Sequence, residues 1–234
     1  MFVPGWITEF DHVDTQQECY ILHYEREMLK ELSTLLTDFI KSSVASLAIT
    51  QVLSHTVLAT ALAAVVWPVS LIQLGSLIDN PWHLGLGKSE QLGHLLAQVL
   101  VSKVAGQRPI DLIGFGLGAL IIYQALSQLV HGHQVLGGVI RHVVLLGLPL
   151  ATPSRAKWLS MNALVNGRFI QGYCHDDFVL KFLFRSSTLT VGDVVGLVPL
   201  NLPTIESVDL STLIESNHLN YARSLDQILL YLNL

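Results

Sequence analysis

A glycine-rich turn between a short apolar run and a helical pattern places the strongest constraint on how this chain can fold. The turn lies in residues 108–129, RPIDLIGFGLGALIIYQALSQL. The apolar run after Pro109 is typical of a buried parallel strand. Three glycines at alternate positions follow it, and the apolar spacing from residue 119 to 129 predicts a helix. A strand, a sharp turn and a helix in this order indicate an α/β fold.

Two kinds of site are built on such a turn. The nucleophile elbow of α/β-hydrolases has the pattern G-x-S-x-G, and here Gly116 stands where that pattern has serine. The dinucleotide fingerprint G-x-G-x-x-G/A is matched by Gly114, Gly116 and Ala119. That fingerprint also needs an acidic residue about 20 positions further on. No Asp or Glu occurs between Leu112 and His175, so the sequence favours the elbow, and we predict no cofactor and no metal.

Strand and helix patterns alternate along the rest of the chain. Further strands are expected at residues 19–24, 139–148, 168–173 and 206–210, with an apolar strand-like start at residues 1–4. Helices are expected at residues 25–38, 177–184 and 222–232, and another beyond an N-cap at Ser89. This order predicts one domain over residues 1–234, with a mostly parallel sheet covered by helices on both faces. We expect the strand at 110–113 near its centre.

A long run without charge interrupts this pattern. No Asp, Glu, Lys or Arg occurs from residue 42 to 78. Residues 57–74 are long and apolar enough to be a transmembrane candidate. The alternative is a helical hairpin, broken near Pro68, that is buried or lies on a membrane surface. We favour the hairpin, because a spanning helix would sever the strand pattern that resumes at Ile110. The stretch from Val44 to Ile78 is therefore expected to flank the active-site mouth and to associate with membranes.

Composition narrows the function classes. Charged residues make up 13% of the chain, against about 25% in an average soluble protein, so some of the surface is expected to meet a lipid or another apolar partner. The net charge of −5 gives no reason to expect nucleic-acid binding. Cys19 and Cys174 are too few for a disulfide framework and are expected to be buried free thiols. The first ten residues lack the basic region of a signal peptide, which favours an intracellular, membrane-associated protein.

An acid and a histidine follow the elbow in the order that α/β-hydrolases use: nucleophile, acid, histidine. Asp177 follows the strand at 168–173, with Asp176 as the alternative acid, and His218 follows the last strand. Each has another interpretation, because Asp177 can cap the helix that it precedes and His218 is one of ten histidines. Their position and order together favour an acid–histidine pair beside Gly116.

At this point the chain resembles the transmembrane and coiled-coil domain-containing hydrolase-like proteins, a family of serine hydrolases or lipases. The resemblance covers nearly the whole chain and rests on an ordered set of motifs. They are VPGW (3–6), IDNPW (78–82), RPIDLIGFGLGA (108–119), VVLLGLP (143–149), NGRFIQGYCHDDFVL (166–180), GLVPL (196–200) and ESVDLS…NHLNYA (206–222).

The resemblance implies an α/β-hydrolase fold and a longer parent protein. Family members carry the elbow as G-F-S-L-G or a close variant, so Gly116 stands at the nucleophile position, and the family's acid and histidine fall on Asp177 and His218. The oxyanion hole of this fold uses the backbone N–H after the nucleophile and one from an earlier loop. Here those donors are expected to be Leu117 and Trp6, although Trp6 can equally be a core residue after a turn.

The expected function is that of an esterase or lipase acting on apolar acyl esters, with activity lost because Gly116 carries no nucleophile. The alternative is a non-catalytic membrane or trafficking adaptor that uses the hydrolase fold as a binding surface. Restoring a serine at position 116 and assaying ester hydrolysis discriminates the two.

Overall fold

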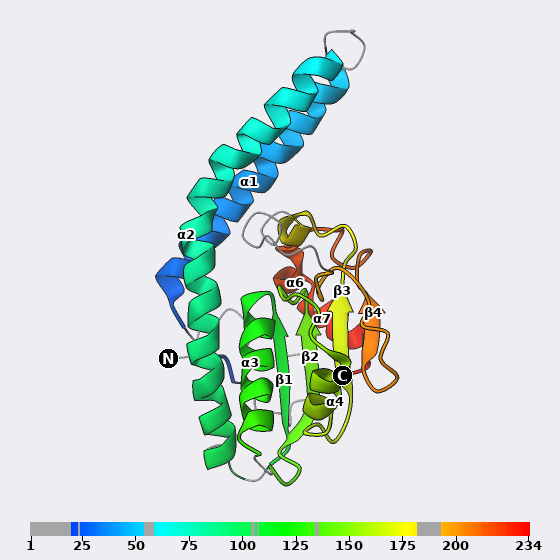
Figure 1. The fold of residues 1–234 in the computed structure, drawn as a ribbon. Coiled ribbons are helices and arrows are strands. Elements are labelled where there is room, and N and C mark those ends of the chain that lie inside the picture. The colour runs from blue at the N-terminus through cyan, green and yellow to red at the C-terminus, as the bar shows by residue number, and fades with distance from the viewer. Residues whose placement is uncertain are drawn as a thin grey trace.

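A four-stranded parallel sheet forms the centre of the computed structural model, which describes residues 20–22, 24–53, 59–103, 106, 108–133, 136–181 and 193–234. Its strands are β1 (Ile110–Phe115), β2 (Ile140–Leu146), β3 (Phe169–Tyr173) and β4 (Glu206–Asp209), in the order β1-β2-β3-β4. All three neighbouring pairs are parallel. The expected parallel sheet is therefore confirmed. Because its strands all run in one direction, their carboxyl ends lie together at the same end of the sheet (Figure 1).

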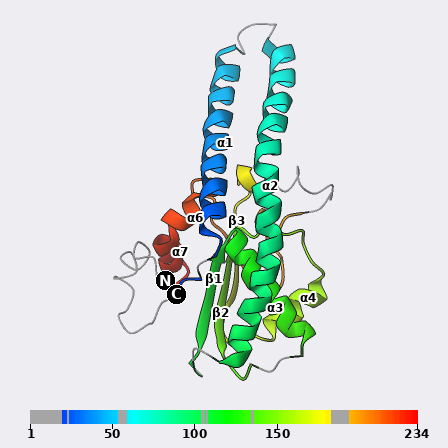
Figure 2. The same ribbon diagram turned by 90° about the vertical axis from the view of Figure 1, so that its left-hand side faces the viewer.

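Helices cover both faces of this sheet. Helices α3 (Leu117–His131) and α4 (Arg155–Asn162) lie on one face, and α6 (Asn220–Arg223) and α7 (Leu225–Tyr231) lie on the other (Figure 2). Side chains of β2 alternate between the two cores: Val143 and Leu145 belong to the first, Val144 and Leu146 to the second. All four are fully buried. Burial on both faces explains why β2 is a continuous apolar run in the sequence.

Two strand predictions are wrong. Strand β1 is not central: it lies at an edge of the described sheet and pairs there with β2 alone. Residues 20–22 and 24, expected in a strand, have no regular secondary structure. A central position needs a strand on each side of β1, and none of the described residues supplies the second one. The strand-like start at residues 1–4 lies outside the described residues.

Two long helices precede the sheet and pack side by side. Helix α1 (Arg26–Leu53) and the first part of helix α2 (Ala59–Ser102) project as an arm beyond the carboxyl ends of the strands, and the rest of α2 lies along α3 (Figures 1 and 2). The break expected near Pro68 is wrong, because α2 continues through Pro68 and Pro81. Each proline removes one backbone hydrogen bond, but a helix of 44 residues packed along α1 and α3 retains the others. No helix among the described residues combines the length and apolarity needed to cross a membrane.

Small residues allow α2 to lie close to α3. Gly85, Ser89, Gly93 and Ala97 follow one another at four-residue spacing and are all buried. A Cβ atom on Gly93 would lie 2.4 Å from Cβ of Gln124, which leaves no room for a side chain. The N-cap predicted at Ser89 is wrong: this residue lies inside α2, and its hydroxyl donates to the Gly85 carbonyl at 2.7 Å.

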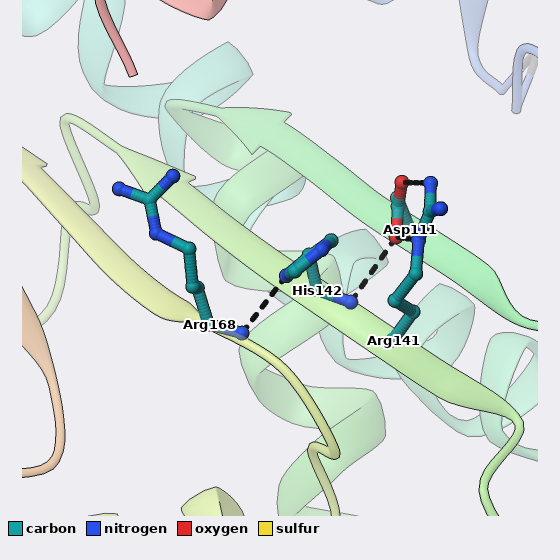
Figure 3. A network of polar contacts seen from close by, with 4 residues as sticks. All are labelled: Asp111, Arg141, His142 and Arg168. Carbon is teal, nitrogen blue, oxygen red and sulfur yellow. Dashed lines mark hydrogen bonds and ion pairs between the residues drawn. The ribbon is translucent and has the colours of Figure 1, made fainter. Parts of the chain in front are cut away.

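A polar network ties the strands together near their amino ends. Asp111 on β1 accepts hydrogen bonds from the guanidinium of Arg141 and from the backbone N–H of His142 (Figure 3). The ring Nδ1 of His142 accepts the backbone N–H of Arg168 at 2.8 Å. The Arg168 guanidinium makes two hydrogen bonds to Glu206 on β4. These contacts join the four strands by side chains as well as by backbone pairing.

Candidate active site

Gly116 forms the turn between β1 and α3. Its φ is +53° and its ψ is −123°, a backbone conformation that glycine adopts far more easily than other residues. Its N–H donates to the Leu146 carbonyl at 2.9 Å, and its carbonyl accepts the Leu120 N–H at 3.1 Å. A Cβ on Gly114 would lie 2.7 Å from the backbone of Gly118. The turn is therefore held by β2 and by α3, and it permits close packing of strand and helix.

His218 and Asp177 form a buried hydrogen-bonded pair beyond the strand ends. The two atoms concerned, Nδ1 of His218 and Oδ2 of Asp177, lie 2.6 Å apart. Asp177 is fully buried and His218 is 9% exposed. A buried carboxylate is stabilised by a charge-assisted hydrogen bond. The pair therefore orients the imidazole with its Nδ1 toward Asp177 and leaves Nε2 for another partner.

The imidazole faces Gly116. A Cβ atom on Gly116 would lie 3.1 Å from Nε2 and 3.7 Å from Cε1 of His218. Apart from the two chain neighbours of Gly116, no other described residue has an atom within 4 Å of that position. A side chain at position 116 would therefore meet His218 first, and the imidazole would have to withdraw by a few tenths of an ångström.

Asp177 also caps the helix that begins at residue 178. Its Oδ1 accepts the Leu180 N–H at 3.0 Å, while Oδ2 bonds His218. The helix-cap interpretation and the acid–histidine interpretation are therefore compatible, because each uses one carboxylate oxygen. Asp176, the alternative acid, is exposed and pairs with Lys181 at 3.0 Å. The structure brings Asp177, not Asp176, to His218.

Tyr221 supports the other side of His218, and the sequence reasoning missed it. The two rings meet edge to face, with centroids 5.5 Å apart and planes at 80°. The Tyr221 hydroxyl is buried and has no hydrogen-bond partner among the described residues. Burial, and then the nearby Asp177, raise the pKa of Tyr221 well above 10. The available signal was its position three residues after His218, which is the spacing of side chains on one face of a helical turn.

The oxyanion donors are only partly within the described residues. Leu117 is the first residue of α3, so its N–H has no carbonyl of the same helix to bond. Trp6 lies outside the described residues, as does Cys19, whereas Cys174 is a buried free thiol. Among the residues that the structure describes, no group of three or more His, Cys, Asp or Glu side chains could hold a metal ion.

Comparison with known proteins places the chain in a family. The profile of the protein-of-unknown-function family DUF726 matches residues 6–234. The chain belongs to this family. It is 35% identical, over 98% of its length, to an uncharacterized membrane protein of Caenorhabditis elegans. It is 36% identical, over 93% of its length, to the transmembrane and coiled-coil domain-containing protein STS1 of rice. It is 31% identical, over 97% of its length, to the protein named probable lipase MIL1 of baker's yeast.

The relatives are longer than this chain. The chain spans 39%, 32% and 22% of the lengths of these three relatives. No solved structure matches it. The relatives' names include membrane proteins and one probable lipase, and the names of several members support membrane association.

Proposed function

We propose that this chain is a serine-hydrolase-like protein with an α/β-hydrolase fold, built to act on apolar acyl esters and inactivated by Gly116. One observation carries the proposal. The buried Asp177–His218 pair points Nε2 at the side-chain position of residue 116, with 3.1 Å between that nitrogen and a Cβ atom placed there. This is the relation that a nucleophile and its general base require.

Each group has a defined part in the proposed chemistry. A hydroxyl at position 116 would attack the ester carbonyl while Nε2 of His218 takes its proton. The Asp177 carboxylate would stabilise the imidazolium through the hydrogen bond to Nδ1. The Leu117 N–H, at the amino end of α3, would donate to the oxyanion. Glycine provides no atom for the attack, so the first step fails in this chain.

The apolar substrate class rests on two features. One relative is named a probable lipase, and residues 42–53 of α1 and 59–78 of α2 carry no charged side chain. The arm also reaches the candidate site. A Cβ on Gly85 of α2 would lie 2.7 Å from the side chain of Leu117, the residue that follows Gly116. A charge-free helical segment that continues to the site suits a lipid ester.

A non-catalytic adaptor is the second candidate. The glycine at the nucleophile position favours it, as do relatives whose names record only membrane proteins. In that function the Asp177–His218 pair would be a structural remnant. An adaptor would not need His218 to lie within reacting distance of a side chain at position 116.

Labelling with a fluorophosphonate probe tests the proposal. We expect the unmodified chain to remain unlabelled and Gly116→Ser to become labelled, because the acid, the histidine and the Leu117 amide are all present. The matched control is Gly118→Ser. It makes the same change two residues away, where a Cβ meets no atom within 4 Å and no histidine, and it should remain unlabelled.

A third variant identifies the base. Gly116→Ser combined with His218→Gln should lose labelling while circular dichroism shows that it is folded. A folded Gly116→Ser variant without labelling would defeat the hydrolase proposal and leave the adaptor. Strong ester hydrolysis by the unmodified chain would show that Gly116 does not disable the site.

A further inference from the structure

The space beside Gly116 contains an unused hydrogen-bond acceptor. His218 is 9% exposed, its Nδ1 is bound to Asp177, and Nε2 makes no hydrogen bond within the part of the chain that the structure describes. Nε2 is not among the fully buried side-chain atoms that lack a hydrogen-bond partner, so solvent or a ligand can reach it. Because Gly116 has no side chain, the partner that a serine would supply is absent from the chain itself. The site is therefore prepared for a group that comes from a ligand.

The chemistry of the site selects the kind of group. With its Nδ1–H directed to the Asp177 carboxylate, a neutral imidazole presents a lone pair on Nε2. A hydroxyl donates to that lone pair, whereas a carboxylate would be repelled by it and by the charge of Asp177. The Leu117 N–H lies at the amino end of α3, directly after Gly116, where backbone N–H groups have no partner within the helix, so it is available to donate to an oxygen.

We propose that an alcohol takes the place of the missing serine and acts as the acceptor in a direct acyl transfer. This inference rests on the acid–histidine site of the proposed function: Gly116 removes the reaction through an acyl-enzyme, and the transfer described here needs only the His218–Asp177 pair. The alcohol's hydroxyl binds beside Nε2, where the serine hydroxyl would lie. His218 removes its proton as the oxygen attacks the acyl carbon, a new ester C–O bond forms and the bond to the leaving oxygen breaks. The proton then passes from His218 to the leaving group. No acyl-enzyme forms, because the chain supplies no nucleophile.

The experiment offers the unmodified chain an activated acyl ester and a small alcohol. The probes are p-nitrophenyl decanoate and methanol, and the product measured is methyl decanoate. We expect its rate of formation to rise with methanol concentration and to exceed that of His218→Gln at least ten-fold. Glutamine keeps an amide N–H for Asp177 but loses the base. Circular dichroism and the unfolding midpoint show that each variant is folded.

Two glycine variants locate the acceptor. Gly116→Ala places a methyl 3.1 Å from Nε2 and should abolish methyl ester formation. Gly118→Ala adds the same methyl where nothing lies within 4 Å, and it should retain the activity. If Gly116→Ala does not fold because of its positive φ, the test is the rate of methyl decanoate formation by the unmodified chain compared with that by His218→Gln.

The outcomes separate this inference from the proposed function. Methyl decanoate that depends on both methanol and His218 supports acyl transfer to an alcohol. The inference is overturned if the folded chain forms no methyl decanoate, or if His218→Gln forms as much as the unmodified chain. It is also overturned if the chain hydrolyses the ester and added methanol does not shift the product from decanoate to methyl decanoate. Labelling of Gly116→Ser alongside any of these negative results would leave the proposed hydrolase site standing and remove only the alcohol acceptor.

Discussion

Asp177 uses its two carboxylate oxygens for two different contacts. Its Oδ1 caps the helix that begins at residue 178, and its Oδ2 orients His218. Full burial makes the carboxylate dependent on both partners, since an unpaired buried charge is strongly destabilising. Its neighbour Asp176 has neither contact and lies in solvent with Lys181. The two aspartates therefore provide a test and a control that differ by one position.

Asp177→Asn tests the chemical part at the residue scale. In the Gly116→Ser background we expect the rate of fluorophosphonate labelling to fall by about 10³–10⁴, because an amide cannot hold the imidazole in the productive tautomer. The measurement is the time course of labelling. Asp176→Asn in the same background should change the rate by less than about two-fold, since exposed ion pairs contribute little. Equal losses from both variants would contradict the assignment of Asp177.

At the scale of elements, the contact between α2 and α3 couples the arm to the elbow. Gly85 lies against Leu117, and Gly93 lies against Gln124 and Ala125. Small residues at four-residue spacing permit this close approach of two helices. The same contact places the base of the arm beside the first residue of α3. A change in the packing of α2 would therefore shift Leu117 at the candidate site.

Gly93→Ala should lower the free energy of unfolding by about 1–3 kcal/mol, because the added Cβ would lie 2.4 Å from Cβ of Gln124 and 3.0 Å from the Ala125 nitrogen. The measurement is urea denaturation followed by circular dichroism. Gly87→Ala is the matched control in the same helix, where a Cβ meets nothing within 4 Å. It should stabilise the protein by up to about 1 kcal/mol through helix propensity. A neutral Gly93→Ala would argue against this packing.

The polar network between the strands predicts a pH dependence. Hydrogen bonds from Arg168 hold the pKa of Glu206 below its usual range, so the ionised form is favoured by folding. The resulting stability is present above the unfolded pKa of about 4.3 and is lost as pH falls through the lower folded value. Glu206→Gln should therefore unfold more easily than the parent at pH 7, by less than about 1 kcal/mol for this partly exposed pair.

Thermal unfolding of both proteins from pH 7 to pH 2 measures this effect. The difference between their midpoints should shrink as the pH falls below about 4, since the parent's carboxylate is then protonated as well. A difference that stays constant across the range would mean that the charge of Glu206 contributes nothing.

At the scale of the whole molecule, the arm and the sheet divide the chain into two parts of different chemistry. The sheet, the helices on it and the adjoining parts of α1 and α2 bury two cores, and Leu32 of α1 and Trp82 of α2 belong to the first. The arm extends away from them past the strand ends (Figure 1), and it includes a run of residues without charge. Lipid surfaces bind helices that combine apolar length with a solvent-facing remainder. We therefore propose the arm as the part of this chain that contacts a membrane.

Liposome flotation tests this placement. The unmodified chain should float with the vesicles, whereas Leu62→Asp combined with Val65→Asp should remain in the dense fraction, because charged groups are costly in the apolar part of a bilayer. Leu95→Asp is the control: it adds a charge to the same helix outside the charge-free run, where the side chain is 50% exposed. The placement on the arm would be contradicted if the unmodified chain did not float. It would also be contradicted if the unmodified chain, the double variant and Leu95→Asp floated equally.

Much of the fold follows from local pattern. Continuous apolar runs, turn glycines and helical spacing predicted β1, β2, β3 and β4, the helix after the elbow and cover on both faces. These patterns depend on residues that are neighbours in the chain, so they can be recognised without knowing the fold. The order of Gly116, Asp177 and His218 also indicated which residues to examine together. Their catalytic roles remain proposals.

Other features were decided only by tertiary structure. Which aspartate meets His218 depends on a contact across 41 positions, and adjacent residues at a turn point in different directions. Pro68 and Ser89 suggested a break and a cap, but α2 continues through both because packing against α1 and α3 stabilises a helix beyond its local propensity. The edge position of β1 and the support from Tyr221 likewise depend on partners distant in sequence or on a ring orientation, which no local pattern records.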